Sequence, residues 1–541
     1  MKVRFVVFAT VIACVISFVY LSSARAADKT ETATATTRPN GPEAFSNVAP
    51  LSPAQHQMLV ERFEQLRESE ARRKGQVSAG PQAPIARNSR ETTVADLSEA
   101  LPAPGALYIG SNKSYPIVGD GQSTVAEPAI ANDGNRWLAT QNWSRGYSNN
   151  AGATWTGIPD GSGPSDAPFF CCDQDAVHDH GRNRTIWSEL FVDSGLTTGV
   201  IRLHVRNANN LSDACTYDIN AGAGVVLDYP HLGLGNDFLY ITANVLTTSA
   251  GWVYAEVWRY PLDPMLACGN LTFNFFTWTG SVGQVVWVPA RGTTDTMYLV
   301  TIENASQNRY FVWPENSGTI YWNVLNAGSS NFGAATCNGG ASNSNWLADT
   351  LSTSAIGFQT RSAVGQDGSV SNHPAQYLAT YIPVNANGSG RPQAYVAGSI
   401  IGTERILTAS GIDSTADIFS SGECFSYSDV TANSRGDLGL MIGFGGSAAG
   451  GAAAAASYLG ISDSFTRGSE RGYFQTVSQC APANDNPTRW GDFLTVHPQE
   501  PVDVAFSGAG YGDESGVGKV RICEFLRGRY AQSYLDRRSQ P

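Results

Sequence analysis

Residues 147–155 read YSNNAGATW. The Asn and Gly residues of this stretch tolerate the backbone of a tight turn, and Thr154 and Trp155 favour a strand. An Asn-rich turn with a Gly, followed at once by strand-forming residues, is typical of a hairpin corner. The stretch therefore predicts two antiparallel strands that meet near residue 150.

The same corner carries a spaced pattern. Ser148, Asn150, Gly152, Thr154 and Trp155 fit Ser-x-Asp-x-Gly-x-Thr-Trp, with Asn150 where Asp is usual. This resembles the Asp-box of the sialidase-like β-propellers. In that family the Asp or Asn caps a hairpin between outer strands, and the Trp packs between neighbouring sheets, away from the catalytic face. The resemblance implies a β-propeller in which Ser148, Asn150, Gly152 and Trp155 are structural.

The rhythm of the chain from residue 105 to 530 points to the same architecture. Short apolar and aromatic runs alternate with Gly, Asn and Ser, and helical periodicity is absent, which predicts an all-β domain. Openings near 127, 173, 229 and 284 are 46, 56 and 55 residues apart, and further openings lie near 358, 425 and 490. This recurrence predicts about seven four-stranded blades. The last strand, near 520–525, is expected to complete the blade that begins near 107.

The N-terminal part is expected to lie outside the propeller. Lys2 and Arg4 precede an apolar run at 5–20 and a small-x-small site at 24–26, which predicts a signal peptide over residues 1–26 and a secreted or periplasmic protein. Residues 27–104 are predicted to hold a disordered start, one helix at about 53–74 and a linker, and residues 531–541 a C-terminal tail. No later stretch reaches the roughly 18 apolar residues of a membrane helix, so no membrane span is expected.

Charge and cysteine content narrow the partners. The chain has 35 basic and 47 acidic residues, and cleavage of the leader would remove three basic residues and leave a net charge of -15. This acidity argues against nucleic acid as a partner, and we expect a monomer. Eight of nine cysteines follow the leader, an even number that predicts disulfides. Adjacent Cys171 and Cys172 allow a vicinal bond or two separate bonds, and ordinary disulfide geometry favours two separate bonds.

Polar residues at the blade openings are the best-placed candidates for chemistry, because a propeller presents its active surface at one mouth of the central channel. Asp173 and Asp175 lie two residues apart on a presumed strand and so on one face, and paired carboxylates suit glycoside hydrolysis. His231 suits a base near neutral pH. The candidate catalytic residues are Glu127, Asp173, Asp175, His231 and Asp492, and the candidate substrate-binding residues are Tyr229, Arg361, Arg489 and Trp490.

The resemblance to sialidases stops before their catalytic set. Those enzymes hold the substrate carboxylate with three arginines, the first in an Arg-Ile-Pro motif, and here Glu127-Pro128 stands at the comparable place. A glutamate would repel the carboxylate that the arginine should hold. The fold is therefore carried over, and the sialidase residues are not.

These observations predict an exported propeller that acts on a polysaccharide or glycoconjugate, as a glycoside hydrolase. One alternative is a polysaccharide lyase, with His231 or Tyr229 as base and Arg361 or Arg489 neutralising a uronate. Another is a glycan- or protein-binding propeller without catalysis. No cofactor and no metal site are expected. Calcium is kept only as an alternative at DQDAVHDHG (173–181), which lacks the length and the bidentate Glu of an EF-hand.

Overall fold

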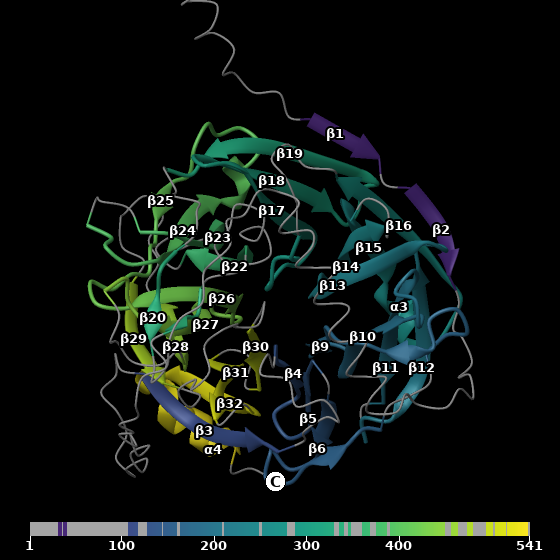
Figure 1. Cartoon of the computed structure of the whole chain (residues 1–541), viewed down its shortest axis with the longest axis horizontal. Coiled ribbons are helices and arrows are strands. Elements are labelled where there is room, and N and C mark those ends of the chain that lie inside the picture. Colours follow the sequence, from purple (N-terminus) through teal and green to yellow (C-terminus); the bar gives the residue numbers. More distant parts are fainter. Residues whose placement is uncertain are drawn as a thin grey trace, which may run out of the picture.

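The computed structural model describes residues 31–34, 36–40, 107–116, 127–142, 144–159, 163–207, 210–247, 251–278, 287–328, 335–339, 344–347, 360–367, 375–386, 390–449, 456–463, 473–479, 494–500, 504–514 and 517–538. Over these residues seven sheets stand around one axis, and the chain visits them in order (Figure 1). The structure is a seven-bladed β-propeller, as the sequence predicted. The predicted signal peptide, the helix at 53–74 and the linker lie outside the described residues.

The first three blades are named here from the axis outward. Blade 1 is β4 (Ala129–Asn132), β5 (Trp137–Gln141), β6 (Ser144–Ser148) and β7 (Thr156–Gly157). Blade 2 is β9 (Asp175–Asp179), β10 (Arg184–Val192), β11 (Gly199–Arg206) and β12 (Asp213–Asn220), with β8 (Phe169–Phe170) also paired to β10. Blade 3 is β13 (Val225–Leu234), β14 (Phe238–Thr247), β15 (Gly251–Pro261) and β16 (Leu271–Trp278). The short helix α3 (Leu262–Leu266) connects β15 to β16.

The other four blades follow the same plan. Blade 4 is β17 (Thr296–Asn304), β18 (Gln307–Pro314) and β19 (Thr319–Asn326), with residues 287–291 on its inner side. Blade 5 is β22 (Arg361–Asp367), β23 (Ala375–Val384), β24 (Tyr395–Gly402) and β25 (Ser414–Thr415), with the 3-10 turn η2 (Thr403–Arg405). Blade 6 is β26 (Cys424–Ala432), β27 (Leu438–Gly445), β28 (Ala456–Asp463) and β29 (Tyr473–Gln479). A separate pair, β20 (Asn338–Gly339) and β21 (Ser344–Asn345), lies outside the blades.

The ring closes in blade 7, where both ends of the propeller share one sheet. Its strands are β30 (Thr495–Gln499), β31 (Ala505–Glu514), β32 (Val517–Arg527) and, outermost, β3 (Leu107–Tyr115). The register between β3 and β32 runs from Leu107 opposite Arg527 to Tyr115 opposite Val520. This pairing joins the first described propeller strand to the last by hydrogen bonds, and the sequence predicted it. The turn η3 (Gly528–Tyr530) follows, and then helix α4 (Ala531–Arg538), which lies within the segment 531–541 predicted as a tail.

The corner at 147–155 is a hairpin turn between β6 and β7, as predicted. The side-chain oxygen of Asn150 accepts the backbone N–H of Thr154 at 2.8 Å, and the Ser148 hydroxyl accepts the N–H of Gly152 at 2.9 Å. Gly152 has φ +74°, and a Cβ there would lie 2.8 Å from the Trp137 ring. The turn therefore requires glycine both for its backbone and for its packing.

Trp155 ties this corner to the neighbouring blade. Its ring lies edge-on to Tyr115 of β3 at 4.9 Å between centroids and to Trp137 of β5 at 6.3 Å. Since β3 belongs to blade 7, the indole packs between two sheets, and its role in the described structure is structural.

Two expectations from the sequence need correction. Cys171 and Cys172 are bonded to each other, and not to two separate partners. They occupy the interruption between β8 and β9, where the inner strand leaves its partner β10, so the chain has room to turn there. The other described pairs are Cys215 with Cys268 and Cys337 with Cys424.

The second correction concerns the segment for which composition predicted disorder. Residues 31–34 form β1 (Glu31–Thr34) and residues 36–40 form β2 (Thr36–Asn40). These strands pair with the outer strands β19 and β16 (Figure 1). An outermost blade strand leaves a row of N–H and C=O groups unpaired, and a Thr-rich segment suits such an edge.

A chain of buried charges lies between blades 1 and 2. Arg145 Nε is 2.9 Å from Glu189, whose other oxygen is 2.7 Å from His204 Nε2, and His204 Nδ1 is 3.1 Å from Asp213. The Arg145 and Glu189 side chains are each 1% exposed. Trp187 stacks on the His204 ring at 4.3 Å. Each buried charge thus has an opposite charge in contact, the condition under which burial is tolerated.

Candidate functional site

Four blades share an unusual backbone turn at or within the inner strand. In each of them one residue has a positive φ: Glu127 (45°), Asp173 (38°), Tyr229 (58°) and Tyr427 (49°). A left-handed backbone at a residue other than glycine costs on the order of 1 to 3 kcal/mol, and such residues gather at functional sites. Four strained residues around one axis therefore indicate a functional site there.

The turn aims the residue two places later at the axis. Those residues are Ala129, Asp175, His231 and Asp429, and they lie opposite Thr140, Ser188, Thr242 and Met441 on the second strands. In β13 and β26 the register shifts at this point, which is a β-bulge. Bulges re-aim side chains and are common beside active sites. The fold therefore brings an imidazole and two carboxylates from three blades to one level of the axis.

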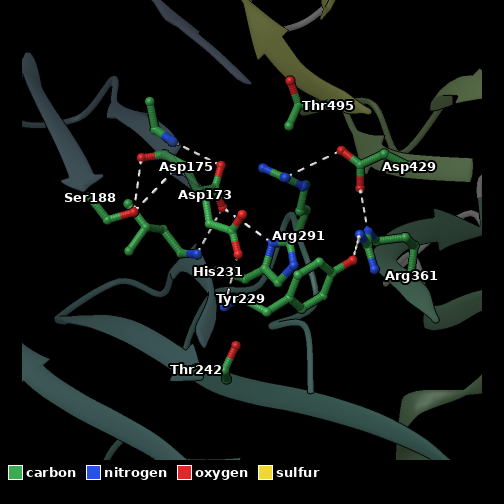
Figure 2. A network of polar contacts seen from close by, with 12 residues as sticks. Asp173, Asp175, Ser188, Tyr229, His231, Thr242, Arg291, Arg361, Asp429 and Thr495 are labelled. Atoms are coloured by element: carbon green, nitrogen blue, oxygen red, sulfur yellow. Dashed lines mark hydrogen bonds and ion pairs between the residues drawn. The ribbon is translucent and has the colours of Figure 1, made fainter. Parts of the chain in front are cut away.

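The two acids of blade 2 both reach the inner strand of blade 3 (Figure 2). Asp173 Oδ2 accepts the backbone N–H of Tyr229 at 3.2 Å. Asp175 Oδ2 accepts the N–H of Leu232 at 2.8 Å and lies 3.7 Å from His231 Nδ1. The premise that both acids stand on one regular strand is wrong, because β9 begins at Asp175 and the positive φ of Asp173 breaks the alternation. Tertiary contacts with blade 3 hold them together instead.

A second group joins blades 3, 4, 5 and 6. Arg361 donates from Nη2 to the Tyr229 hydroxyl at 3.0 Å, and its Nε lies 3.8 Å from Asp429. Arg291 Nη2 lies 3.2 Å from the other oxygen of Asp429, which also accepts the backbone N–H of Val496 at 2.8 Å. Two guanidinium groups thus share one carboxylate (Figure 2).

Tyr229 connects the two groups. Its ring meets the His231 ring edge-on at 4.4 Å, and its hydroxyl accepts from Arg361. The side chains of Asp175, His231, Arg361 and Asp429 are each no more than 2% exposed. The site is therefore one continuous polar network with very little water around its charges, and each electrostatic interaction in it is strong.

Burial and neighbouring charges shift the pKa values of the groups in this network in different directions. Burial acts to raise the pKa of Asp175, but the contact with His231 and the nearby Arg291 outweigh it and lower that pKa to about 2. Burial raises the pKa of Asp429, against the lowering by Arg291 and Arg361. Burial lowers the pKa of His231 to about 4, so its imidazole is neutral at pH 7. Two carboxylates in one network are thus shifted in opposite directions.

The structure brings together five of the nine residues proposed for catalysis and binding: Asp173, Asp175, Tyr229, His231 and Arg361. Glu127 is fully buried at the same turn of blade 1. Asp492, Arg489 and Trp490 lie outside the described residues.

Sequence reasoning missed Arg291 and Asp429. Asp429 had a signal, because YSDVTAN (427–433) places it two residues after an aromatic, as YPHLGLG (229–235) places His231. Arg291 had none, since it lies on 287–291, where the inner strand makes only isolated bridges.

Two negative findings apply to the described ranges. They contain no group of three or more His, Cys, Asp or Glu side chains arranged to hold a metal ion. No helix among them is long and apolar enough to cross a membrane.

Comparison with known proteins adds a likeness of fold. No protein-family model matches the chain, and no curated protein matches it. Among solved structures, the NanB sialidase from Streptococcus pneumoniae is 9% identical, covering 61% of this chain and 67% of that one, with a TM-score of 0.36. The leech intramolecular trans-sialidase is 8% identical over 62% and 67% of the two chains, with a TM-score of 0.35.

Matches of other activity stand beside these sialidases. The α-L-arabinanase of Penicillium chrysogenum is 10% identical over 74% of this chain and 93% of that one, with a TM-score of 0.33. An apocarotenoid oxygenase from Synechocystis is 10% identical over 65% and 73%, with a TM-score of 0.35. The solved structures to which this chain is similar thus include sialidases and proteins of other activity. At these identities and TM-scores the likeness carries no argument about this chain.

Proposed function

We propose that this protein acts on glycans as a glycoside hydrolase, with Asp429 and Asp175 as its two working carboxylates. The observation that carries the proposal is the pair of opposite pKa shifts in one buried network, raised at Asp429 and lowered at Asp175. Environments that push two acids apart are how such enzymes keep one protonated and one ionised. Asp429 would give its proton to the leaving oxygen, and the Asp175 carboxylate would stabilise the positive charge that develops on the sugar ring.

A second candidate, a polysaccharide lyase, is favoured by the contact of Tyr229, His231 and Arg361. The Arg361 donor at 3.0 Å stabilises a negative charge on the Tyr229 oxygen, and the neutral His231 ring lies 4.4 Å away. Either group would then take the proton beside a uronate carboxylate, which Arg361 would neutralise. A binding propeller without catalysis is the third possibility, with the network serving to hold the inner strands.

The proposed setting is outside the cytoplasm, secreted or periplasmic, with the protein acting as a monomer on a polysaccharide or glycoconjugate. Its disulfides are consistent with an oxidising compartment. The lowered pKa of Asp175 keeps that carboxylate charged over the whole range in which such compartments operate.

The deciding experiment incubates the purified protein with a panel of acidic and neutral polysaccharides and follows both reducing ends and the absorbance of unsaturated uronates. New reducing ends alone would support hydrolysis, both signals would support elimination, and neither signal would leave a binding protein. The variant Asp429→Asn should abolish either activity. Asp417→Asn is the matched control. Asp417 lies 2.7 Å from Arg391 and is not part of the axial network.

A further inference from the structure

A cavity of about 160 Å³ lies further along the same inner strands, past the candidate site. It is lined by the ends of the inner strands of five blades and by the segment of blade 4 that follows residue 290. Its polar lining side chains are Asn132, His178, His180, Arg291, Thr293, Thr431 and His497. At roughly 30 Å³ per water molecule, the space corresponds to about five waters.

The lining is rich in donors. Arg291 donates to the His497 ring at 2.8 Å, which requires a neutral imidazole, and burial lowers the pKa of His497 well below its usual value. Among the described residues that line the cavity there is no carboxylate. The Arg291 cation and the uncharged imidazole of His497 therefore lie on this space.

Two donors on the lining have no hydrogen-bond acceptor within the described chain. They are the Thr431 hydroxyl, on a side chain that is 0% exposed, and Nε of Arg291, on a side chain that is 7% exposed. Buried donors are rarely left unpaired, because each costs on the order of 1 to 3 kcal/mol. The cavity thus presents a hydroxyl and a guanidinium N–H to whatever occupies it.

The nearest acids are bound to other donors and do not line the cavity. Asp429 is shared between Arg291 and Arg361, at 3.2 and 3.8 Å. Asp175 accepts the backbone N–H groups of Ala176 and Leu232 at 2.8 Å each. A guanidinium group beside unpaired donors, with no carboxylate on the lining, is an environment that attracts an oxyanion.

We propose that this axial cavity binds one small oxyanion, such as a phosphate, sulfate or carboxylate group, held by Arg291 and Thr431. The site is distinct from the network proposed for catalysis but shares Arg291 with it. An anion bound there would compete with Asp429 for the guanidinium group and would raise the pKa of Asp429 further. The anion site does not depend on the glycan activity, and either one stands if the other fails.

The test is calorimetric titration of the whole protein, disulfides intact, with inorganic phosphate, sulfate and acetate in separate runs in chloride-free buffer. We expect saturable binding of one anion per chain. Preference for phosphate and sulfate would identify a tetrahedral ligand, and preference for acetate a carboxylate. Thr431→Val keeps the shape and removes the hydroxyl, and should weaken binding on the order of tenfold or more.

Thr140→Val is the matched control, since Thr140 is equally buried, its hydroxyl also lacks an acceptor in the described chain, and it does not line the cavity. It should bind as the wild type does. Histidine ring resonances of the wild-type protein give a second readout without any variant, because an anion in the cavity would shift those of His178 and His497. Absence of saturable binding by all three anions, or equal affinity in the two threonine variants, would overturn the proposal.

Discussion

Replacing Glu189 by Gln tests whether the charge chain between blades 1 and 2 stabilises the ring. The Glu189 carboxylate bridges Arg145 and His204, at 2.9 and 2.7 Å. Its replacement removes the negative charge that lies against both of these buried side chains. Removing one partner of a buried ion pair costs about 3 to 5 kcal/mol.

The structure places the expected loss at the lower end of that range, about 3 kcal/mol. Arg145 keeps the carbonyl oxygen of Pro159 at 3.4 Å and the Phe170 ring at 4.1 Å, and His204 keeps Asp213 at 3.1 Å. The assay is equilibrium urea unfolding, followed by tryptophan fluorescence and far-UV circular dichroism, with coincident curves required before a free energy is taken. Trp187 stacks on His204, so its emission reports on the altered network directly.

The difference in stability between wild type and Glu189→Gln should depend on pH, in a direction set by two pKa shifts. Burial opposes both charges, but His204 is held charged by Glu189 and Asp213, so its pKa is raised and its contribution is complete below pH 6.5 and lost as pH rises through the raised value. Arg145 and His204 hold the pKa of Glu189 low, so its contribution is complete above pH 4.5 and lost as pH falls through the lowered value. The difference between wild type and Glu189→Gln should therefore be greatest between pH 4.5 and 6.5.

A control pair separates burial from pairing. Asp263 lies 2.6 Å from Arg182 Nε, as close as the buried pair, but those side chains are 79% and 28% exposed. Asp263→Asn should cost about 1 kcal/mol or less. If both variants lose the same amount, or if Glu189→Gln is within 1 kcal/mol of the wild type, the reasoning on the buried network is wrong.

Three further expectations concern the turn and the axis. Asn150→Ala removes the acceptor of the Thr154 N–H and should lower the free energy of unfolding by about 1 to 2 kcal/mol, while Asn150→Asp should not; urea unfolding measures both. Burial holds the pKa of His231 at about 4, below its unfolded value of 6.5, so its titration should cost about 3 kcal/mol of stability as pH falls from 6.5 to 4. Unfolding of His231→Gln measured against pH should lack this part of the loss. If the protein hydrolyses glycans, Asp175→Asn should lower kcat on the order of 100-fold or more with the circular dichroism spectrum unchanged.

Much of the ring could be predicted because blades are local objects. Blade openings were expected near 173, 229 and 425, and the inner strands β9, β13 and β26 begin at Asp175, Val225 and Cys424. Each of these strands pairs with a neighbour close in the chain, so alternation and turn residues carry the information. Closure by β3 and β32 was also foreseeable, since a ring of repeats must join its ends.

The axial site was only partly foreseeable, and its members show why. Tyr229 and His231 were found because a distinctive motif holds both. Arg291 and Asp429 meet each other from residues 138 positions apart in the chain, and no local pattern records that contact. The vicinal cysteine bond was likewise misjudged, because alternation in the sequence does not predict the interruption between β8 and β9 where it lies.

The blades, their number and the hairpin at 147–155 follow from local features of the chain, because they depend on short-range alternation, turn chemistry and spacing. Which polar groups share the axis depends on how the blades pack in three dimensions. Radial packing of seven sheets brings distant segments of inner strands together, and three of the four left-handed turns then direct Asp175, His231 and Asp429 inward. The low dielectric of that shared interior sets their protonation, and it exists only once the ring has closed.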